Sequence, residues 1–270
     1  VVAAVAIAGK ALYDLGSQFD AAYDRIRVGT GKTGTELAGL KDDFRDVVKS
    51  VPTDFDKASD AVALLNKRLG LTGEPLRTVA KQVLELSRLT GTELGENIES
   101  PTRLFGDWGV KNAEMAPTID RVFRLSQSTG IGVSELSRLM VQFGSPLRQL
   151  GLDFDTSAAM FAKFEKEGVN IQAVMPGLKM GLKNLSKPTG DAADVMERLG
   201  ITSKDPAKGL QQTFEAIKNA GSAAEANQIA FAIFGTRAGP DLAAAVREGR
   251  FELSDLMGQM RTGKETVRSA

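Results

Sequence analysis

The chain has 270 residues, 42% of them hydrophobic, and its 34 basic residues balance its 34 acidic ones. This much apolar material excludes a disordered chain, and a net charge of zero argues against nucleic acid as a main partner, because phosphate binding normally needs a basic excess. Cysteine and histidine are both absent from the sequence, which excludes disulfides, metal sites built from either residue, thiol nucleophiles and imidazole bases.

The chain opens with a short uncharged run, Val1–Gly9. A membrane-spanning helix needs about 20 residues, and no basic residue precedes the run, so neither a complete span nor a complete signal peptide fits it. We expect the chain to be a piece of a longer protein, and one hypothesis places a membrane-active segment upstream of Val1.

Apolar residues then recur at three- and four-residue intervals along most of the chain, which is the spacing of one face of an α-helix. Leu37, Leu40, Phe44 and Val47 show this pattern, with charged residues between them. No stretch alternates convincingly between apolar and polar residues as a half-buried strand would. The sequence therefore predicts an all-α fold of roughly ten to twelve short helices, forming a compact helical module of a longer chain.

Glycine and proline mark the expected helix ends, because glycine suits the left-handed residue that ends a helix and proline is tolerated at a helix start. Capping-box spacing adds two expected starts, at Thr33 with Glu36 and at Ser222 with Glu225. The expected stops are Gly70, Gly91, Gly130, Gly168, Gly200, Gly221 and Gly235, and the prolines near expected starts are Pro52, Pro75, Pro206 and Pro240.

A stretch rich in glycine and lysine, residues 181–190, is the best candidate for a domain boundary. It predicts a helical region over residues 1–180 and a C-terminal helical subdomain over residues 191–270. No other low-complexity stretch or long linker interrupts the sequence.

The segment Gly29–Thr33 reads Gly-Thr-Gly-Lys-Thr and is similar to the phosphate-binding core of a P-loop. The full motif requires a further glycine where Ile26 stands, and it requires a strand before the loop. The residues before Gly29 have helical spacing instead. The sequence therefore predicts a helix-to-helix turn with Thr33 as N-cap, and no nucleotide binding.

Several carboxylate clusters could in principle serve acid–base chemistry, among them Asp42–Asp43 and the group of Asp54, Asp56 and Asp60. Lysine and arginine lie among them at helical spacing, so we interpret them as solvated helix faces with ion pairs. Asp153 is expected to cap the helix that begins near Thr156. Nothing in the sequence pairs an acid with a nucleophile, and we expect a chain without catalysis, cofactor or metal.

Several stretches, taken in order, resemble the tail tape measure protein family of bacteriophages over most of the chain. The Ile233–Leu242 segment, with Phe234-Gly235 followed by Arg237 before a Leu/Ala-rich helix, is the most telling of these, and Lys187–Asp205 matches the family less well. The other stretches are Phe19 to Leu37, Val51–Phe55, Leu71–Glu74, Leu86–Gly91, Phe105–Val110, Ser128–Gly130 with Leu136, and Gly144–Leu152.

The resemblance implies a non-catalytic structural component of a phage tail, which sets tail length during assembly and is released from the tail tube at infection. The implied location is the lumen of the virion tail, after assembly in the host cytoplasm and with entry into the host envelope on ejection. The implied partners are tail tube and tail tip proteins, other copies of the chain in a homo-oligomer, tail assembly chaperones and the host membrane, but no sequence-specific nucleic acid.

The candidate structural or interface residues are Phe105, Trp108, Phe234, Gly235 and Arg237, since they lie in the stretches that best match the family. We expect Trp108 and Phe234 to be buried, either in this module or against a neighbouring copy. Two interpretations of Arg237 stay open: it is an ordinary surface residue, or it pairs with carbonyls or carboxylates at a subunit contact.

Two alternatives stay open at this point. The first is a membrane-active helical module that helps form a channel for DNA passage into the host. The second is a peptidoglycan hydrolase carried on the same chain, although no acid–nucleophile pair supports it.

Overall fold

The computed structural model describes residues 2–149, 151–202 and 205–250, together with residues 252, 263, 266, 267 and 269, and it gives side chains in the first helix from Asp14 onward. Thirteen α-helices and no strand occur in these residues, so the prediction of an all-α fold is confirmed and the predicted number of helices was slightly low. The helices are α1 (Val2–Thr30), α2 (Gly34–Ser50), α3 (Phe55–Leu69), α4 (Gly73–Thr90), α5 (Leu94–Trp108), α6 (Asn112–Thr129), α7 (Val133–Gln149), α8 (Phe154–Lys166), α9 (Ile171–Ser186), α10 (Asp191–Arg198), α11 (Pro206–Lys218), α12 (Ala223–Phe234) and α13 (Gly239–Arg247).

The chain divides into two compact units, each with its own core. The first unit comprises residues 1–106, 110–120 and 265–270, and the second comprises residues 107–109 and 121–264. The boundary expected between residues 181 and 190 stays a prediction: α9 continues to Ser186 there, and a short loop leads to α10.

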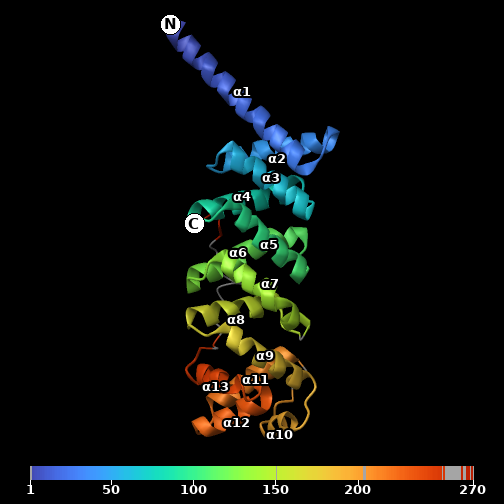
Figure 1. Cartoon of the computed structure of the whole chain (residues 1–270), viewed down its shortest axis with the longest axis vertical. Helices are drawn as coiled ribbons and strands as arrows, with labels where there is room; N and C mark the ends of the chain where they lie inside the picture. The colour runs from blue at the N-terminus through green and yellow to red at the C-terminus, as the bar shows by residue number, and fades with distance from the viewer. Residues whose placement is uncertain are drawn as a thin grey trace. The chain divides into compact units, whose positions relative to one another are not determined.

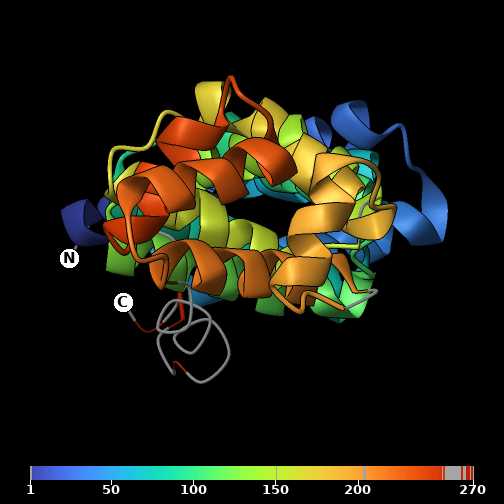
Figure 2. The same cartoon turned by 90° about the horizontal axis from the view of Figure 1, so that it is seen from below.

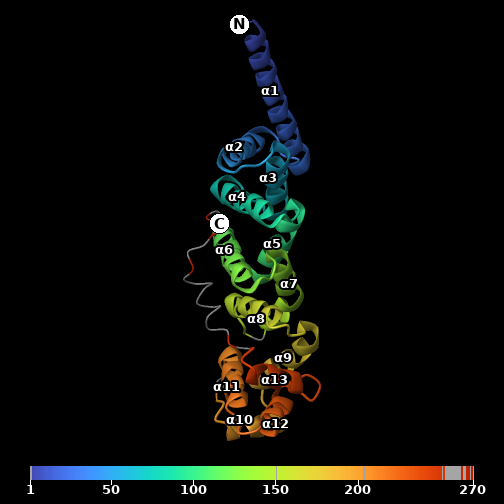
Figure 3. The same cartoon turned by 90° about the vertical axis from the view of Figure 1, so that its left-hand side faces the viewer.

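In the first unit, α1 packs against α3, and α2 packs against both α3 and α4 (Figures 1 and 3). Three phenylalanines join the first three of these helices. The ring centroid of Phe19 lies 4.7 Å from that of Phe55 and 6.0 Å from that of Phe44, with edge-to-face geometry. This geometry is the favoured one for aromatic pairs, so the cluster fixes how α1 meets the two helices after it.

In the second unit, α9 contacts all four of the helices that follow it, and α12 lies beside α13, which Figure 2 shows in orange and red. The contact is close because two residues of α9 lack a side chain. A Cβ at Gly177 would overlap Ala238, and a Cβ at Gly181 would overlap the ring of Phe234. Asn184 also donates a hydrogen bond of 2.8 Å to the carbonyl of Ile233.

The predicted glycine stops are confirmed with one exception. Positive φ angles occur at all seven predicted positions but Gly221. At Gly168 two interactions hold the turn that ends α8. The amide of the next residue, Val169, donates a 2.8 Å hydrogen bond to the carbonyl of Phe164, and the Val169 side chain is buried. The Ser222 capping box also forms: its hydroxyl accepts from the amide of Glu225, whose carboxylate accepts from Gly221.

The prolines divide into two groups. The four prolines expected near helix starts all lie there: Pro206 begins α11, Pro240 is the second residue of α13, Pro75 is the third residue of α4, and Pro52 lies in the loop just before α3. Four other prolines lie inside helices, where each removes one backbone hydrogen bond: Pro101 in α5, Pro117 in α6, Pro146 in α7 and Pro176 in α9.

Candidate functional site

The segment Gly29–Thr33 connects α1 directly to α2. The last two residues of α1 are Gly29 and Thr30, and no strand precedes the segment. The amide of Gly31 donates to the carbonyl of Arg27 at 2.9 Å, and the amide of Lys32 donates to the hydroxyl of Thr30 at 3.2 Å. A P-loop needs such amides free to surround phosphates, whereas here they close the turn.

Thr33 occupies the N-cap position of α2, but its side chain makes no capping bond. The predicted capping box with Glu36 is therefore wrong. The carboxylate of Glu36 instead accepts a 3.1 Å bond from the ammonium group of Lys32, one turn before it. Lys32, the residue that would have to bind a phosphate in a P-loop, is therefore already paired with a carboxylate.

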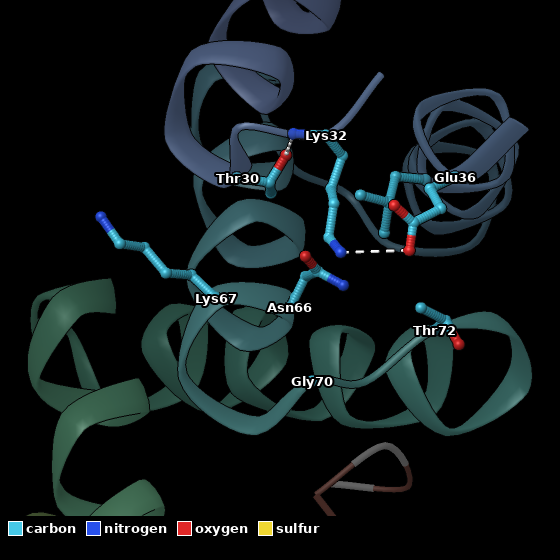
Figure 4. A pocket seen from close by; sticks show the side chains of 8 residues that line it. Thr30, Lys32, Glu36, Asn66, Lys67, Gly70 and Thr72 are labelled. Carbon is cyan, nitrogen blue, oxygen red and sulfur yellow. Dashed lines mark hydrogen bonds and ion pairs between the residues drawn. The ribbon is translucent and has the colours of Figure 1, made fainter. Parts of the chain in front are cut away.

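A hollow of about 330 Å³ lies between this turn and the turn that joins α3 to α4 (Figure 4). The ion pair of Lys32 and Glu36 spans it, and the side chain of Lys67 points away from that pair. The amide group of Asn66 donates to the carbonyl of Leu71 at 2.9 Å. The lining residues are Thr30, Lys32, Glu36, Leu40, Asn66, Lys67, Gly70 and Thr72.

These contacts make the hollow a poor phosphate site, because Lys32 is already paired with Glu36 and the amide group of Asn66 already donates to a carbonyl. The absence of nucleotide binding stays a prediction, since it concerns binding itself. Among the residues that the structure describes, no group of three or more acidic side chains could hold a metal ion. Across the same residues, every helix is too short or too polar to span a bilayer.

Trp108 is the last residue of α5 and is half-buried within this chain, and its burial against a neighbouring copy stays a prediction. Its indole nitrogen donates to the carbonyl of Met140 at 3.2 Å, and its ring meets Phe154 edge to face at 5.5 Å. A Cβ at Gly144 would lie 2.6 Å from the indole. Trp108 is thus a packing residue of the second unit whose side chain is partly accessible. Phe105, three residues earlier, is buried.

Phe234, Gly235 and Arg237 lie at the turn from α12 to α13. Phe234 is only 1% exposed, as predicted, and its ring centroid lies 5.9 Å from that of Phe214. Gly235 has φ +82° and ψ 162°, a region open to glycine almost alone. Arg237 is exposed and makes no hydrogen bond or ion pair with the described residues. Whether these residues meet another subunit stays a prediction.

Asp43 is the residue that the sequence analysis misjudged. We assigned it to a solvated helix face, yet it is only 3% exposed. Its two carboxylate oxygens accept a 2.8 Å bond from the amide of Gly73 and a 2.7 Å bond from the guanidinium of Arg77. It therefore caps the start of α4 from α2. The spacing held a signal, because Asp43 falls on the same face as Leu40 and Val47.

The other acidic residues behave as predicted or nearly so. Asp153 caps α8, accepting a 2.7 Å bond from the amide of Thr156, and Asp54 caps α3 in the same way. Arg25 lies 3.2 Å from Asp56 and 3.8 Å from Asp60. Partial burial raises the pKa of Asp60, and the nearby Arg25 only partly offsets this effect.

Comparison with known proteins gives two matches. The sequence model of the phage-related minor tail protein family matches residues 41–235. The chain is also similar to a protein described as a probable tape measure protein of Escherichia phage P2, with 21% identity over 231 residues. That alignment covers 85% of this chain but 28% of the P2 protein, so the chain spans less than a third of its relative's length. No solved structure matches.

The family match extends from within α2 to the glycine that ends α12, which is well over half of the chain. It includes Phe105, Trp108, Phe234 and Gly235 among the candidate residues, whereas Arg237 lies just beyond it. The resemblance noted from individual motifs is therefore confirmed by a continuous match. The chain belongs to the phage-related minor tail protein family.

Proposed function

We propose that this chain is a non-catalytic structural module of a tape measure protein, which sets tail length during assembly and leaves the tail tube at infection. The observation that carries the proposal is the family match over residues 41–235, together with the similarity to a probable tape measure protein along most of the chain. The packing of the described side chains supports it: the candidate residues fill cores and turns and do not converge on a reactive group.

The proposed location is the tail lumen of the virion. The proposed partners are the tube and tip proteins, other copies of the chain, tail assembly chaperones and, after ejection, the host envelope. Because the sequence has no cysteine, no disulfide would hold its tertiary structure together during passage through a narrow tube. Zero net charge would limit electrostatic trapping on a charged wall.

The proposal is tested on tails of the phage that encodes the chain. Mass spectrometry should find peptides of residues 41–235 in purified tails, and these peptides should resist added protease while the tail is intact. Particles that have ejected their DNA should have lost them, while tube protein peptides stay constant as the internal control. Absence from intact tails, or full digestion before ejection, would refute a position in the lumen.

The alternative is a membrane-active module that helps DNA into the host. The observation in its favour is the uncharged start of α1, over Val2–Gly9. Eight residues are well short of the roughly 20 that a helix needs to cross a bilayer, so this function would depend on chain outside these residues. Dye release from lipid vesicles by the 270-residue chain would favour the alternative, and intact vesicles would leave the tail role as the better account.

A further inference from the structure

Helix α9 carries a row of three lysines on one face. Lys179, Lys183 and Lys187 follow one another at intervals of four residues, with Lys187 as the C-cap of the helix. Lys183 and Lys187 are exposed, and Lys179 is partly exposed. None of the three forms an ion pair with any residue that the structure describes. Helix α9 itself contains no acidic residue, so nothing on it neutralises the row.

The helix dipole explains only part of this row. The carbonyl end of a helix attracts cations, which accounts for Lys183 in the last turn of α9 and for Lys187 just after it. Lys179 lies too far from the end of the helix to benefit. Its ammonium group instead lies over the ring of Phe143, 5.9 Å from the ring centroid, so the row runs along apolar surface.

Two exposed apolar side chains lie beside the lysines. Met180 of α9 is 48% exposed and Phe231 of α12 is 37% exposed, and no other large apolar side chain among the described residues of the second unit is exposed. Gly235 connects them, since Phe231 lies one turn before it on α12 and the sulfur of Met180 lies 2.8 Å from the place of its missing Cβ. The two side chains therefore share one surface, which residue 235 leaves open.

Arg237 adds a fourth cation to this surface. It follows Gly235 by two residues, is exposed, and makes no ion pair with the described residues. The one acidic residue of α12, Glu225, lies at the other end of that helix and accepts a hydrogen bond from the amide of Gly221. The result is an apolar centre with cations around it. We call it the α9–α12 patch, and it consists of Lys179, Met180, Lys183, Lys187, Phe231 and Arg237.

We propose that the α9–α12 patch binds an acidic amphipathic helix of a protein partner. Successive lysines of the row are about 6 Å apart along α9, because four residues rise 1.5 Å each. Carboxylates one turn apart on a second helix have the same interval and would face the row. Apolar side chains between those carboxylates would cover Met180 and Phe231.

The apolar centre favours a protein helix over other anionic partners. Phosphates of a nucleic acid could pair with the lysines, but Phe231 is mostly buried, with its ring held against Gly239, so it offers a base little surface for stacking. A membrane is bound by apolar side chains that project into the lipid. Met180 rests on Gly235 instead, and Phe231 rests on Gly239.

This inference deepens the proposed function, and it rests on the proposal that the chain has protein partners in the tail. It adds the surface that one partner would contact and the charge that this partner would carry. The experiment uses the purified chain and a synthetic peptide, so its failure would leave the proposed position in the tail lumen untouched.

The test is binding of a labelled synthetic peptide to the 270-residue chain, followed by fluorescence anisotropy. The peptide is a short helix former with glutamates one turn apart and leucines between them on the same face. A second peptide of the same composition has its glutamates spread around the helix. The first should bind saturably and more tightly than the second, and its binding should weaken as salt is raised. No binding, or equal binding of both peptides, would overturn the proposal.

Variants of the chain locate the binding site, once their circular dichroism spectra show that they are folded. Lys183→Glu should weaken binding about tenfold, because it brings like charges together across the contact. Met180→Ser should weaken it severalfold through the loss of apolar contact, without changing the salt dependence.

Lys111→Glu is the matched control. It makes the same change of charge at another exposed lysine, which lies between α5 and α6 in the first unit, and it should bind the peptide as the wild type does. Wild-type affinity in Lys183→Glu, or an equal loss in Lys111→Glu, would overturn the proposal.

Nucleic acid and membrane are the competing occupants of the patch. A short DNA duplex, and vesicles of phosphatidylethanolamine and phosphatidylglycerol, replace the peptide in the same assay conditions. Binding of either that is tighter than peptide binding and is abolished by Lys183→Glu would assign the patch to phosphate groups and overturn the proposal. Weaker binding of both would support a protein partner.

Discussion

Replacing Phe234 with alanine removes an aromatic ring from the place where α12, the turn to α13 and α9 meet. The ring is 1% exposed and lies over Gly181, which has no side chain that could move into the vacated space. Truncating a buried phenylalanine to alanine costs about 3 to 5 kcal/mol, and the rigid glycine wall argues for the upper part of that range. For a domain of roughly 150 to 250 residues this corresponds to a fall in Tm of about 6 to 20 °C.

Phe231→Ala is the matched control for this experiment. It deletes the same ring one turn earlier in α12, where the side chain is 37% exposed. Thermal unfolding followed by circular dichroism should show a large fall in Tm for Phe234→Ala and a small one for Phe231→Ala. Equal falls in the two variants, or no change in the first, would show that the contact with Gly181 does not support the second unit.

Four further outcomes follow from the described contacts. Asp43→Asn should cost about 1.5 to 3 kcal/mol in urea unfolding, because it weakens two hydrogen bonds of a charged group, whereas Asp42→Asn, on the exposed side of the same helix, should stay below about 1 kcal/mol. Gly144→Ala should shift the tryptophan emission spectrum, since the added methyl displaces the indole; an unchanged spectrum would contradict that contact. The pKa of Asp60 is raised, so its ionised form is disfavoured by folding: Asp60→Asn should be neutral or slightly stabilising at pH 7. Any gain should shrink as pH falls through the folded pKa and vanish below the unfolded pKa, where the carboxyl is protonated in both states. Calorimetry with ATP and magnesium should detect no binding, and saturable binding that Lys32→Ala abolishes would show the turn to be a phosphate site.

Helix periodicity and glycine stops were enough to predict the fold class and most helix ends, because both depend on residues close in sequence. Gly181 shows where such reasoning ends. Glycine is unfavourable inside a helix, so Gly181 reads as a break. The structure places it within α9, where the missing side chain admits the ring of Phe234. That benefit comes from a residue more than fifty positions away, which no local pattern contains.

The candidate residues divide in the same manner. Phe234 could be predicted as buried because it ends an apolar helix at a glycine. For Asp43 the spacing placed the residue on the apolar face of α2, but its partners Gly73 and Arg77 come from α4 and meet it only after α2 and α4 pack. For Trp108 the family resemblance indicated an important position but not its exposure. The exposure of Asp43 and of Trp108 depends on contacts between helices that are distant in sequence, and local sequence patterns do not reveal such contacts.

The absence of a side chain at Gly235, in the α12–α13 turn, affects the chemistry of the neighbouring Met180 sulfur. The sulfur of Met180 occupies the space where a side chain of residue 235 would begin. Met180 is 48% exposed, whereas the other methionines whose burial the structure gives are at most 5% exposed. In a sequence without cysteine, oxidants reach sulfur only through methionine, and among the methionines whose burial the structure gives they should reach Met180 first. Conversion to the sulfoxide would place a polar oxygen against the Phe234–Gly235 backbone, so ageing in air should damage this turn before any buried methionine is modified.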